Sequence, residues 1–99
     1  MPKIVWSPAA RRDLQKSIEF IQEFSPAAAA KLASKVVDAL ELLEAMPEMG
    51  PVMEQLEDIG QYRYLLVAKH LIIYRLEDDA ILVQRFWDAR RSPDSLVVK

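Results

Sequence analysis

Three apolar segments in the C-terminal half are separated by gaps of only two residues, and this spacing constrains the fold more than any other feature. Residues 61–67, 70–77 and 80–86 are rich in leucine, isoleucine, valine and tyrosine. Their apolar positions repeat every two residues, which is the period of a β-strand. So short a gap joins only antiparallel neighbours, since a parallel connection needs about a dozen residues. The sequence therefore predicts an antiparallel meander of three strands.

Two amphipathic helices are predicted ahead of the meander, and each is opened by a Ser-Pro pair, at residues 7–8 and 25–26. Serine caps free N–H groups at a helix start, and proline suits the first helical position. Apolar residues then recur at helical spacing until Met-Pro at 46–47 stops the second helix. The short connection makes the helices antiparallel neighbours. Residues 11–13, Arg-Arg-Asp, are expected on a solvated helix face.

A short β-forming segment at residues 3–6 precedes the helices, so the expected order is β-α-α-β-β-β. We expect an α+β fold in which the N-terminal helical hairpin packs on one face of an antiparallel sheet, because each helix has one apolar stripe to bury. The other face should be partly exposed or bind a partner. Residues 1–99 should form a single domain, with an acidic connection at 52–60, a loop from residue 87 and a loose tail at 93–99.

Composition gives little support to enzyme or cofactor chemistry. The chain has no cysteine, two glycines and one histidine, which removes thiolate metal sites and glycine-rich phosphate loops. The lone His70 is expected on the surface or at a turn, although histidine can also transfer protons near neutral pH. We therefore expect no metal and no cofactor. Because the sequence has no long apolar run, we expect neither a membrane span nor a signal peptide. This favours the cytoplasm.

Arginines and aromatic residues are interleaved in the second half of the chain. The arginines on the predicted strands and just after them are Arg63, Arg75, Arg85, Arg90 and Arg91, and the aromatic residues among them are Tyr62, Tyr64, Tyr74 and Trp87. Such a set suits a protein-binding hot spot or single-stranded nucleic acid. It is also consistent with ordinary ion pairs to Glu77, Asp88 and Asp94. The net charge of −2 argues against binding to a nucleic acid backbone.

The order and spacing of short motifs over residues 3–93 resemble the RelE/ParE superfamily of bacterial type II toxins, on its ParE-like or plasmid-stabilisation branch. The matching motifs are Ser7-Pro8-x-Ala10-x-x-Asp13-Leu14, Ser25-Pro26-x-x-Ala29, Leu40-x-x-Leu43, Pro47-x-Met49-Gly50, Arg63-x-Leu65, Ile73-Tyr74-Arg75 and Val83-x-Arg85-x-x-Asp88-x-Arg90-Arg91-x-Pro93. The resemblance implies a growth-inhibiting toxin that a cognate antitoxin wraps and neutralises.

The resemblance implies one of two modes of action. ParE-like members inhibit DNA gyrase, whereas RelE-like members are endoribonucleases that cut messenger RNA on the ribosome. The RNA-cutting members use basic residues across the sheet and a tyrosine or histidine near the chain end. Arg63 fits such a position, but Leu71 stands where many of them carry arginine, and neither tyrosine nor histidine follows Asp88. We therefore favour a non-enzymatic toxin that binds gyrase.

The two modes of action predict different functional residues. In a binding toxin, the residues that contact the target or the antitoxin are expected to be Arg63, Arg85, Trp87, Asp88, Arg90 and Arg91. In a ribonuclease, the catalytic set would be Arg63, Arg85, Tyr74 and His70. A third interpretation is an inert relic that only binds its antitoxin. The expected partners are a cognate antitoxin protein, with oligomers formed through that complex, and DNA gyrase. Direct binding of nucleic acid is not expected.

Overall fold

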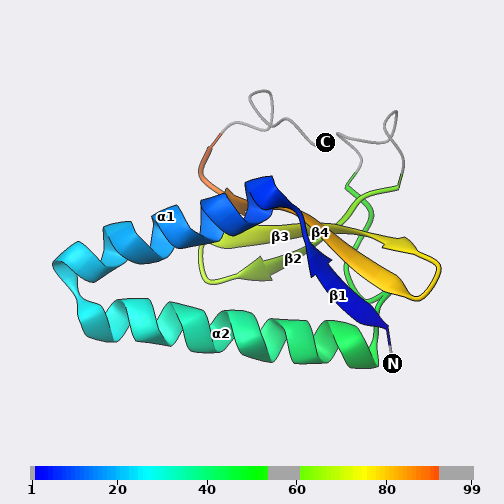
Figure 1. The fold of residues 1–99 in the computed structure, drawn as a ribbon, viewed down its shortest axis with the longest axis horizontal. Coiled ribbons are helices and arrows are strands. Elements are labelled where there is room, and N and C mark those ends of the chain that lie inside the picture. The colour runs from blue at the N-terminus through cyan, green and yellow to red at the C-terminus, as the bar shows by residue number, and fades with distance from the viewer. Residues whose placement is uncertain (1, 54–60, 92–99) are drawn as a thin grey trace.

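The structure, a computed structural model, describes residues 2–53 and 61–91, and in it a helical hairpin lies against a four-stranded sheet (Figure 1). The elements are β1 (Lys3–Trp6), α1 (Pro8–Phe24), α2 (Pro26–Ala45), β2 (Arg63–Val67), β3 (His70–Glu77) and β4 (Ala80–Asp88). The predicted order of elements is therefore confirmed. Among the described residues, no helix is long and apolar enough to cross a membrane. Of the acidic connection predicted at 52–60, residues 54–60 lie outside the described residues, and so does the whole tail predicted at 93–99.

The strands are arranged in the order β1-β4-β3-β2. Strands β2, β3 and β4 form the predicted antiparallel meander, joined by the two-residue turns. The expectation of a wholly antiparallel sheet is wrong for β1, which runs parallel to β4 with Ile4 opposite Ile81. The helical hairpin together with β2 and β3 forms the long connection between these two strands that a parallel arrangement requires. Strand β4 also continues to Asp88, so Trp87 and Asp88 belong to a strand and not to a loop.

Both Ser-Pro pairs act as predicted at the helix starts. The Ser7 hydroxyl accepts a hydrogen bond from the Ala10 N–H at 3.0 Å, and the Ser25 hydroxyl accepts one from Ala28 at 3.1 Å. Ser7 has a second function, because its hydroxyl also donates to the Gln84 carbonyl at 2.7 Å. This bond attaches the start of α1 to β4 at the point where β1 ends.

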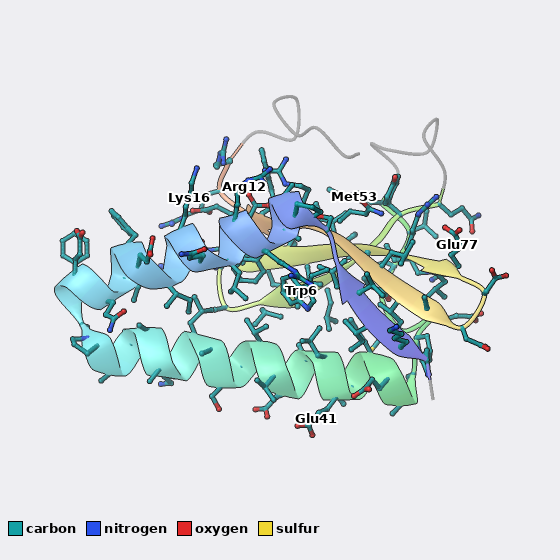
Figure 2. The ribbon with its side chains drawn as sticks, in the orientation of Figure 1. Trp6, Arg12, Lys16, Glu41, Met53 and Glu77 are labelled. Carbon is teal, nitrogen blue, oxygen red and sulfur yellow. The ribbon has the colours of Figure 1, made fainter. Side chains whose placement is uncertain are left out.

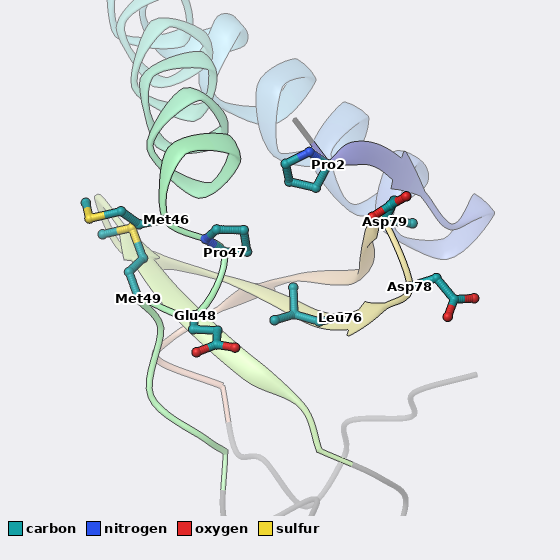
Figure 3. Close-up of a pocket in the computed structure, with 9 residues that line it drawn as sticks. Pro2, Met46, Pro47, Glu48, Met49, Leu76, Asp78 and Asp79 are labelled. Carbon is teal, nitrogen blue, oxygen red and sulfur yellow. The ribbon is translucent and has the colours of Figure 1, made fainter.

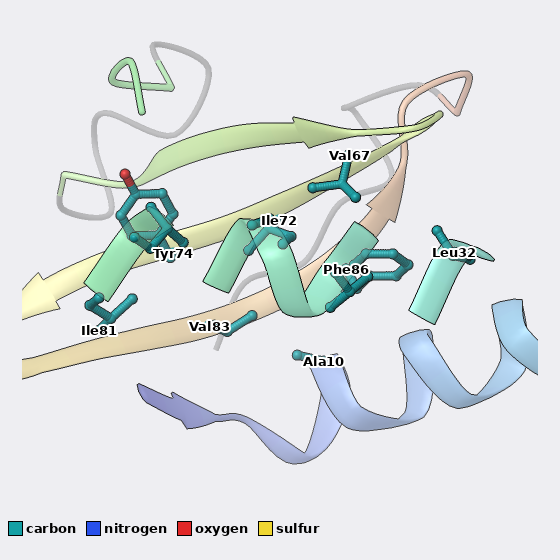
Figure 4. Packing of buried hydrophobic residues seen from close by; sticks show 11 residues of the cluster. Ala10, Leu32, Val67, Ile72, Tyr74, Ile81, Val83 and Phe86 are labelled. Carbon is teal, nitrogen blue, oxygen red and sulfur yellow. The ribbon is translucent and has the colours of Figure 1, made fainter. Parts of the chain in front are cut away.

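The main core lies between the helices and the sheet (Figure 4). Leu43 on α2 and Ile72, Tyr74, Ile81 and Val83 on the strands have no exposed surface. Because side chains alternate along a strand, Ile72 and Tyr74 face the helices while Ile73 faces the other way. The two helices therefore cover a single face of the sheet, as the sequence predicts.

A second, smaller cluster covers part of the opposite face. Met53, Tyr62, Ile73 and Trp87 are each at most 5% exposed and pack together. Met53 comes from the segment after α2, which lies beside the sheet away from α2 (Figure 2). Val52 in this segment bridges to Arg63, and the Met53 N–H donates to the Tyr62 carbonyl at 2.7 Å. This face is thus more covered than the sequence suggests.

Candidate functional site

Arg63 and Tyr74 both grip the turn that follows α2. The Tyr74 hydroxyl accepts a hydrogen bond from the Gly50 N–H at 3.0 Å and donates to the Pro47 carbonyl at 2.9 Å. The Arg63 guanidinium donates to the carbonyls of Gly50 at 2.8 Å and Glu48 at 3.2 Å. Burial raises the pKa of the Tyr74 phenol. We call this arrangement the turn clamp. In it, the polar groups of Arg63 and Tyr74 bind backbone atoms of the turn.

Arg85 and Asp13 form an ion pair between β4 and α1. The Asp13 carboxylate accepts from Arg85 Nε at 2.6 Å and Nη2 at 2.9 Å, and also from the Phe86 N–H at 3.1 Å. The hydrogen bond to Asp13 raises the pKa of Arg85. The expectation that Asp13 lies on a solvated helix face is wrong. Since β1 pairs with β4 only as far as Val83, Asp13 takes the place of a neighbouring strand at Phe86.

The Asp13–Arg85 pair was not predicted, although the sequence holds a signal for it. Asp13 follows the fully buried Ala10 by three residues, so it lies beside the apolar stripe of α1. A charged residue at the border of a buried stripe needs a partner. The sequence does not identify that partner, because it is 72 residues away.

Trp87 is covered and supports two arginines. Its side chain is 3% exposed, and the Arg91 and Arg85 guanidinium carbons lie 4.1 Å and 5.2 Å from its ring centroid. The indole N–H has no hydrogen-bond partner among the described residues. Arg91 itself is exposed. Trp87 therefore does not present its own ring to a partner but holds a surface cation in a cation–π contact.

Asp88 and Arg90 form a local surface pair where β4 ends. The Arg90 guanidinium donates to the Asp88 carboxylate at 2.7 and 3.0 Å, and the Arg90 N–H donates at 2.9 Å. These bonds hold the pKa of Asp88 well below its usual range. The Arg90 side chain is 69% exposed. Of the six predicted contact residues, Arg90 and Arg91 are thus the two on the outer surface.

His70 is buried, which contradicts its expected surface position. It is 8% exposed, and its ring stacks on Phe86 with centroids 4.6 Å apart. The physical reason is strand alternation, which places His70 on the same face as Ile72 and Tyr74. Burial lowers the pKa of His70 below its ordinary value of 6.5, and the nearby Asp88 carboxylate raises it by a smaller amount.

The lowered pKa predicts how stability depends on pH. The unfolded chain binds the His70 proton more readily than the folded protein, so this contribution is complete at high pH and is lost as pH falls below about 6.5. We expect the free energy of unfolding, measured with urea, to decline between about pH 7 and pH 5. The His70→Phe variant should lack this decline. An equal decline in both proteins would show that another group titrates. Asp88 is not that group, since its pKa lies far lower.

The four residues of the ribonuclease interpretation do not converge. Arg63 and Tyr74 share the turn clamp, whereas His70 begins β3, four residues before Tyr74. Arg85 is held by Asp13. The structure instead brings together Arg85, Trp87 and Arg91. Within the described part of the chain, no group of histidine and carboxylate side chains could hold a metal ion.

Two cavities of opposite charge lie at different places on the surface. The larger has a volume of about 750 Å³ and lies between the end of α2 and the β3–β4 hairpin, with Glu48, Asp78 and Asp79 in its wall (Figure 3). The other, of about 240 Å³, lies between α2 and the β2–β3 turn, and its charged residues are all cations. Opposite charges at the two places predict different partner chemistry at each.

Comparisons with known proteins agree on family and fold. A family model described as the ParE toxin of the type II toxin–antitoxin system parDE matches residues 4–93. The structure is similar to a chain from the solved chromosomal ParDE toxin–antitoxin system of P. aeruginosa, with a TM-score of 0.72 and 17% sequence identity. This match covers 91% of the present chain and 98% of that chain. No curated protein sequence matches significantly.

Proposed function

The chain belongs to the ParE family of type II toxins, and from this premise we propose that it inhibits growth by binding DNA gyrase in the cytoplasm, without cutting RNA. The resemblance stated from the sequence is confirmed at the level of the family and the fold. The proposal extends to a cognate antitoxin that neutralises the toxin and through which the complex assembles.

The proposal that the protein acts by binding rests mainly on how the Arg91 side chain is held. Its guanidinium lies 4.1 Å from the centroid of a buried tryptophan ring, while the residue remains exposed. A cation held in this way loses less side-chain entropy when a partner binds than a free one, and arginine is common at interface hot spots. Arg91 is therefore a prepared contact point for an acidic site on a target protein.

The placement of the ribonuclease candidates supports the same proposal. Acid–base catalysis needs its groups within hydrogen-bond reach of one reacting centre. Tyr74 has both of its hydrogen bonds inside the turn clamp and no exposed surface, and His70 is stacked in the core. Removing either from its place would disturb the fold before it could serve a reaction.

The test is a pulse-label experiment after induction of the protein in bacteria, combined with a supercoiling assay on purified gyrase. We expect thymidine incorporation to fall before methionine incorporation, and purified protein to inhibit supercoiling. Because charge reversal at an interface contact is costly, Arg91→Glu should weaken gyrase inhibition about tenfold or more. Arg12→Glu, a charge reversal at an exposed position on α1, is the matched control and should inhibit like the wild type.

Two outcomes would contradict the proposal. If methionine incorporation collapses first, the protein blocks translation, and Tyr74→Phe and His70→Phe become the informative variants. If Arg91→Glu and Arg12→Glu inhibit gyrase equally, the contact point is not at Arg91. Circular dichroism of each variant guards against loss of folding as the cause.

A further inference from the structure

The smaller cavity has a ring of cations that nothing in the described structure neutralises fully. Lys31 and Lys35 come from α2, Lys69 from the β2–β3 turn, and Arg90 from the turn after β4. All four are exposed, and no ion pair within the described residues involves any of the three lysines. Asp88 pairs with Arg90 and so offsets one charge. Three cations from two elements therefore surround one small hollow in a chain whose net charge is −2.

The floor of this cavity is apolar and ends on a buried histidine. Ile21 and Leu32 line it between the helices, and His70 lines it from the sheet. His70 is 8% exposed, and its Nδ1 has no hydrogen-bond partner among the described residues. The cavity thus offers apolar surface and cationic side chains together.

The cavity continues into a shallow groove between α2 and β2. The groove has a volume of about 260 Å³ and shares Lys35 and Ala68 with the cavity. Leu42 and Leu66, which also line it, are 47% and 61% exposed. Asp38 is the carboxylate in its wall. A ligand that fills both hollows must carry negative charge at one end and apolar side chains along its length.

We propose that this cavity and groove are a docking site for an acidic, amphipathic peptide segment of a protein partner. A glutamate or aspartate of the segment enters the ring of Lys31, Lys35, Lys69 and Arg90, and its leucine-like side chains lie along Leu42 and Leu66. The identity of the partner as the antitoxin rests on the function proposed above, whereas the ligand chemistry rests on the cavity alone.

Charge complementarity favours a peptide over nucleic acid. A phosphate backbone is bound by cations placed along a track, with strong dependence on net positive charge. Here the cations surround one hollow with an apolar floor, and the next hollow contains Asp38, which would repel phosphate. An acidic side chain on an apolar helix or strand fits both parts of the site.

The experiment is an NMR titration of the full-length protein with a synthetic peptide that carries leucine and glutamate at helical spacing. His70 is the chain's one histidine, so its imidazole signals report on the cavity directly. We expect the acidic peptide to shift these signals in a saturable manner. The same peptide with glutamine in place of each glutamate should bind at least about tenfold more weakly, because it lacks the charge.

Matched charge reversals test where the peptide binds. Lys31→Glu/Lys35→Glu changes two exposed residues four positions apart on α2, and should weaken binding about tenfold or more. Arg12→Glu/Lys16→Glu changes two exposed residues with the same spacing on α1 (labelled in Figure 2) that do not line the cavity, and should bind like the wild type. Lys69→Glu, in the turn, provides an independent variant if the α2 pair fails to fold.

Three results would overturn this proposal. They are equal binding of the glutamate and glutamine peptides, equal binding by the two double variants, and tighter binding of an oligothymidylate that shifts the same His70 signals. The titration contains no gyrase, so its failure is separate from failure of the proposed function. Conversely, Lys31→Glu/Lys35→Glu should still inhibit supercoiling like the wild type, because the gyrase contact is assigned to Arg91.

Discussion

Gly50→Ala is expected to destabilise the protein by roughly 3 kcal/mol or more, because the added methyl group has no room. A Cβ at Gly50 would clash with the Tyr64 carbonyl oxygen and would lie 2.6 Å from the Tyr74 hydroxyl. The first of these is backbone in a strand, so it cannot rotate away. Accommodating the methyl group requires the turn to move, which breaks the turn clamp. Urea unfolding monitored by circular dichroism measures the loss.

The control variants separate the steric clash from other effects. Met49→Ala changes the neighbouring residue, which is 38% exposed, and should alter stability little. Tyr74→Phe removes the phenol oxygen, so the Gly50 N–H and the Pro47 carbonyl each lose a hydrogen bond. We expect the free energy of unfolding to fall by about 2 kcal/mol. Adding Tyr74→Phe to Gly50→Ala should give no rescue, since the Tyr64 carbonyl remains in the way. A stable Gly50→Ala protein would show that the turn does not depend on the clamp.

Asp13→Ala is expected to lower the free energy of unfolding by about 2 kcal/mol, which is the range for hydrogen bonds to a charged group. The substitution removes three hydrogen bonds at once, two from Arg85 and one from the Phe86 N–H. Both side chains of this pair are less than 20% exposed, at 17% and 18%, so solvent replaces the lost bonds poorly. The measurement is again urea unfolding, with Arg85→Ala and the double variant completing a cycle.

The double-variant cycle of Asp13 and Arg85, compared with a change in the exposed pair of Asp88 and Arg90, tests whether Asp13 stabilises the fold. The two single changes should be strongly non-additive, since they remove the same interaction. Arg90→Ala breaks the other bidentate pair, with Asp88, but that pair is local and Arg90 is exposed, so only a small change is expected. Additive effects of Asp13→Ala and Arg85→Ala would mean that the ion pair does not join α1 to β4 energetically.

The local elements of this protein were predictable because their signals are local. The Ser-Pro pairs determine the starts of α1 and α2 through the hydroxyl caps of Ser7 and Ser25, which act within three residues. The two-residue gaps at 68–69 and 78–79 allow only antiparallel hairpins, so the β2-β3-β4 meander follows from chain geometry. The position of Arg90 and Arg91 after the last strand follows in the same way.

The assignment of roles to individual side chains required the tertiary structure. Arg63, Arg85 and Tyr74 are spaced like functional residues, yet their partners are Gly50, Asp13 and Pro47, which are 13 to 72 residues away. The parallel direction of β1 and the burial of His70 and Trp87 depend in the same way on which faces meet after the chain has folded. Periodicity identifies the face on which a side chain lies, but the packing of distant elements decides what that face meets. The sequence by itself therefore determined the elements and the family, and only the tertiary structure showed which charges hold the fold and which remain free for a partner.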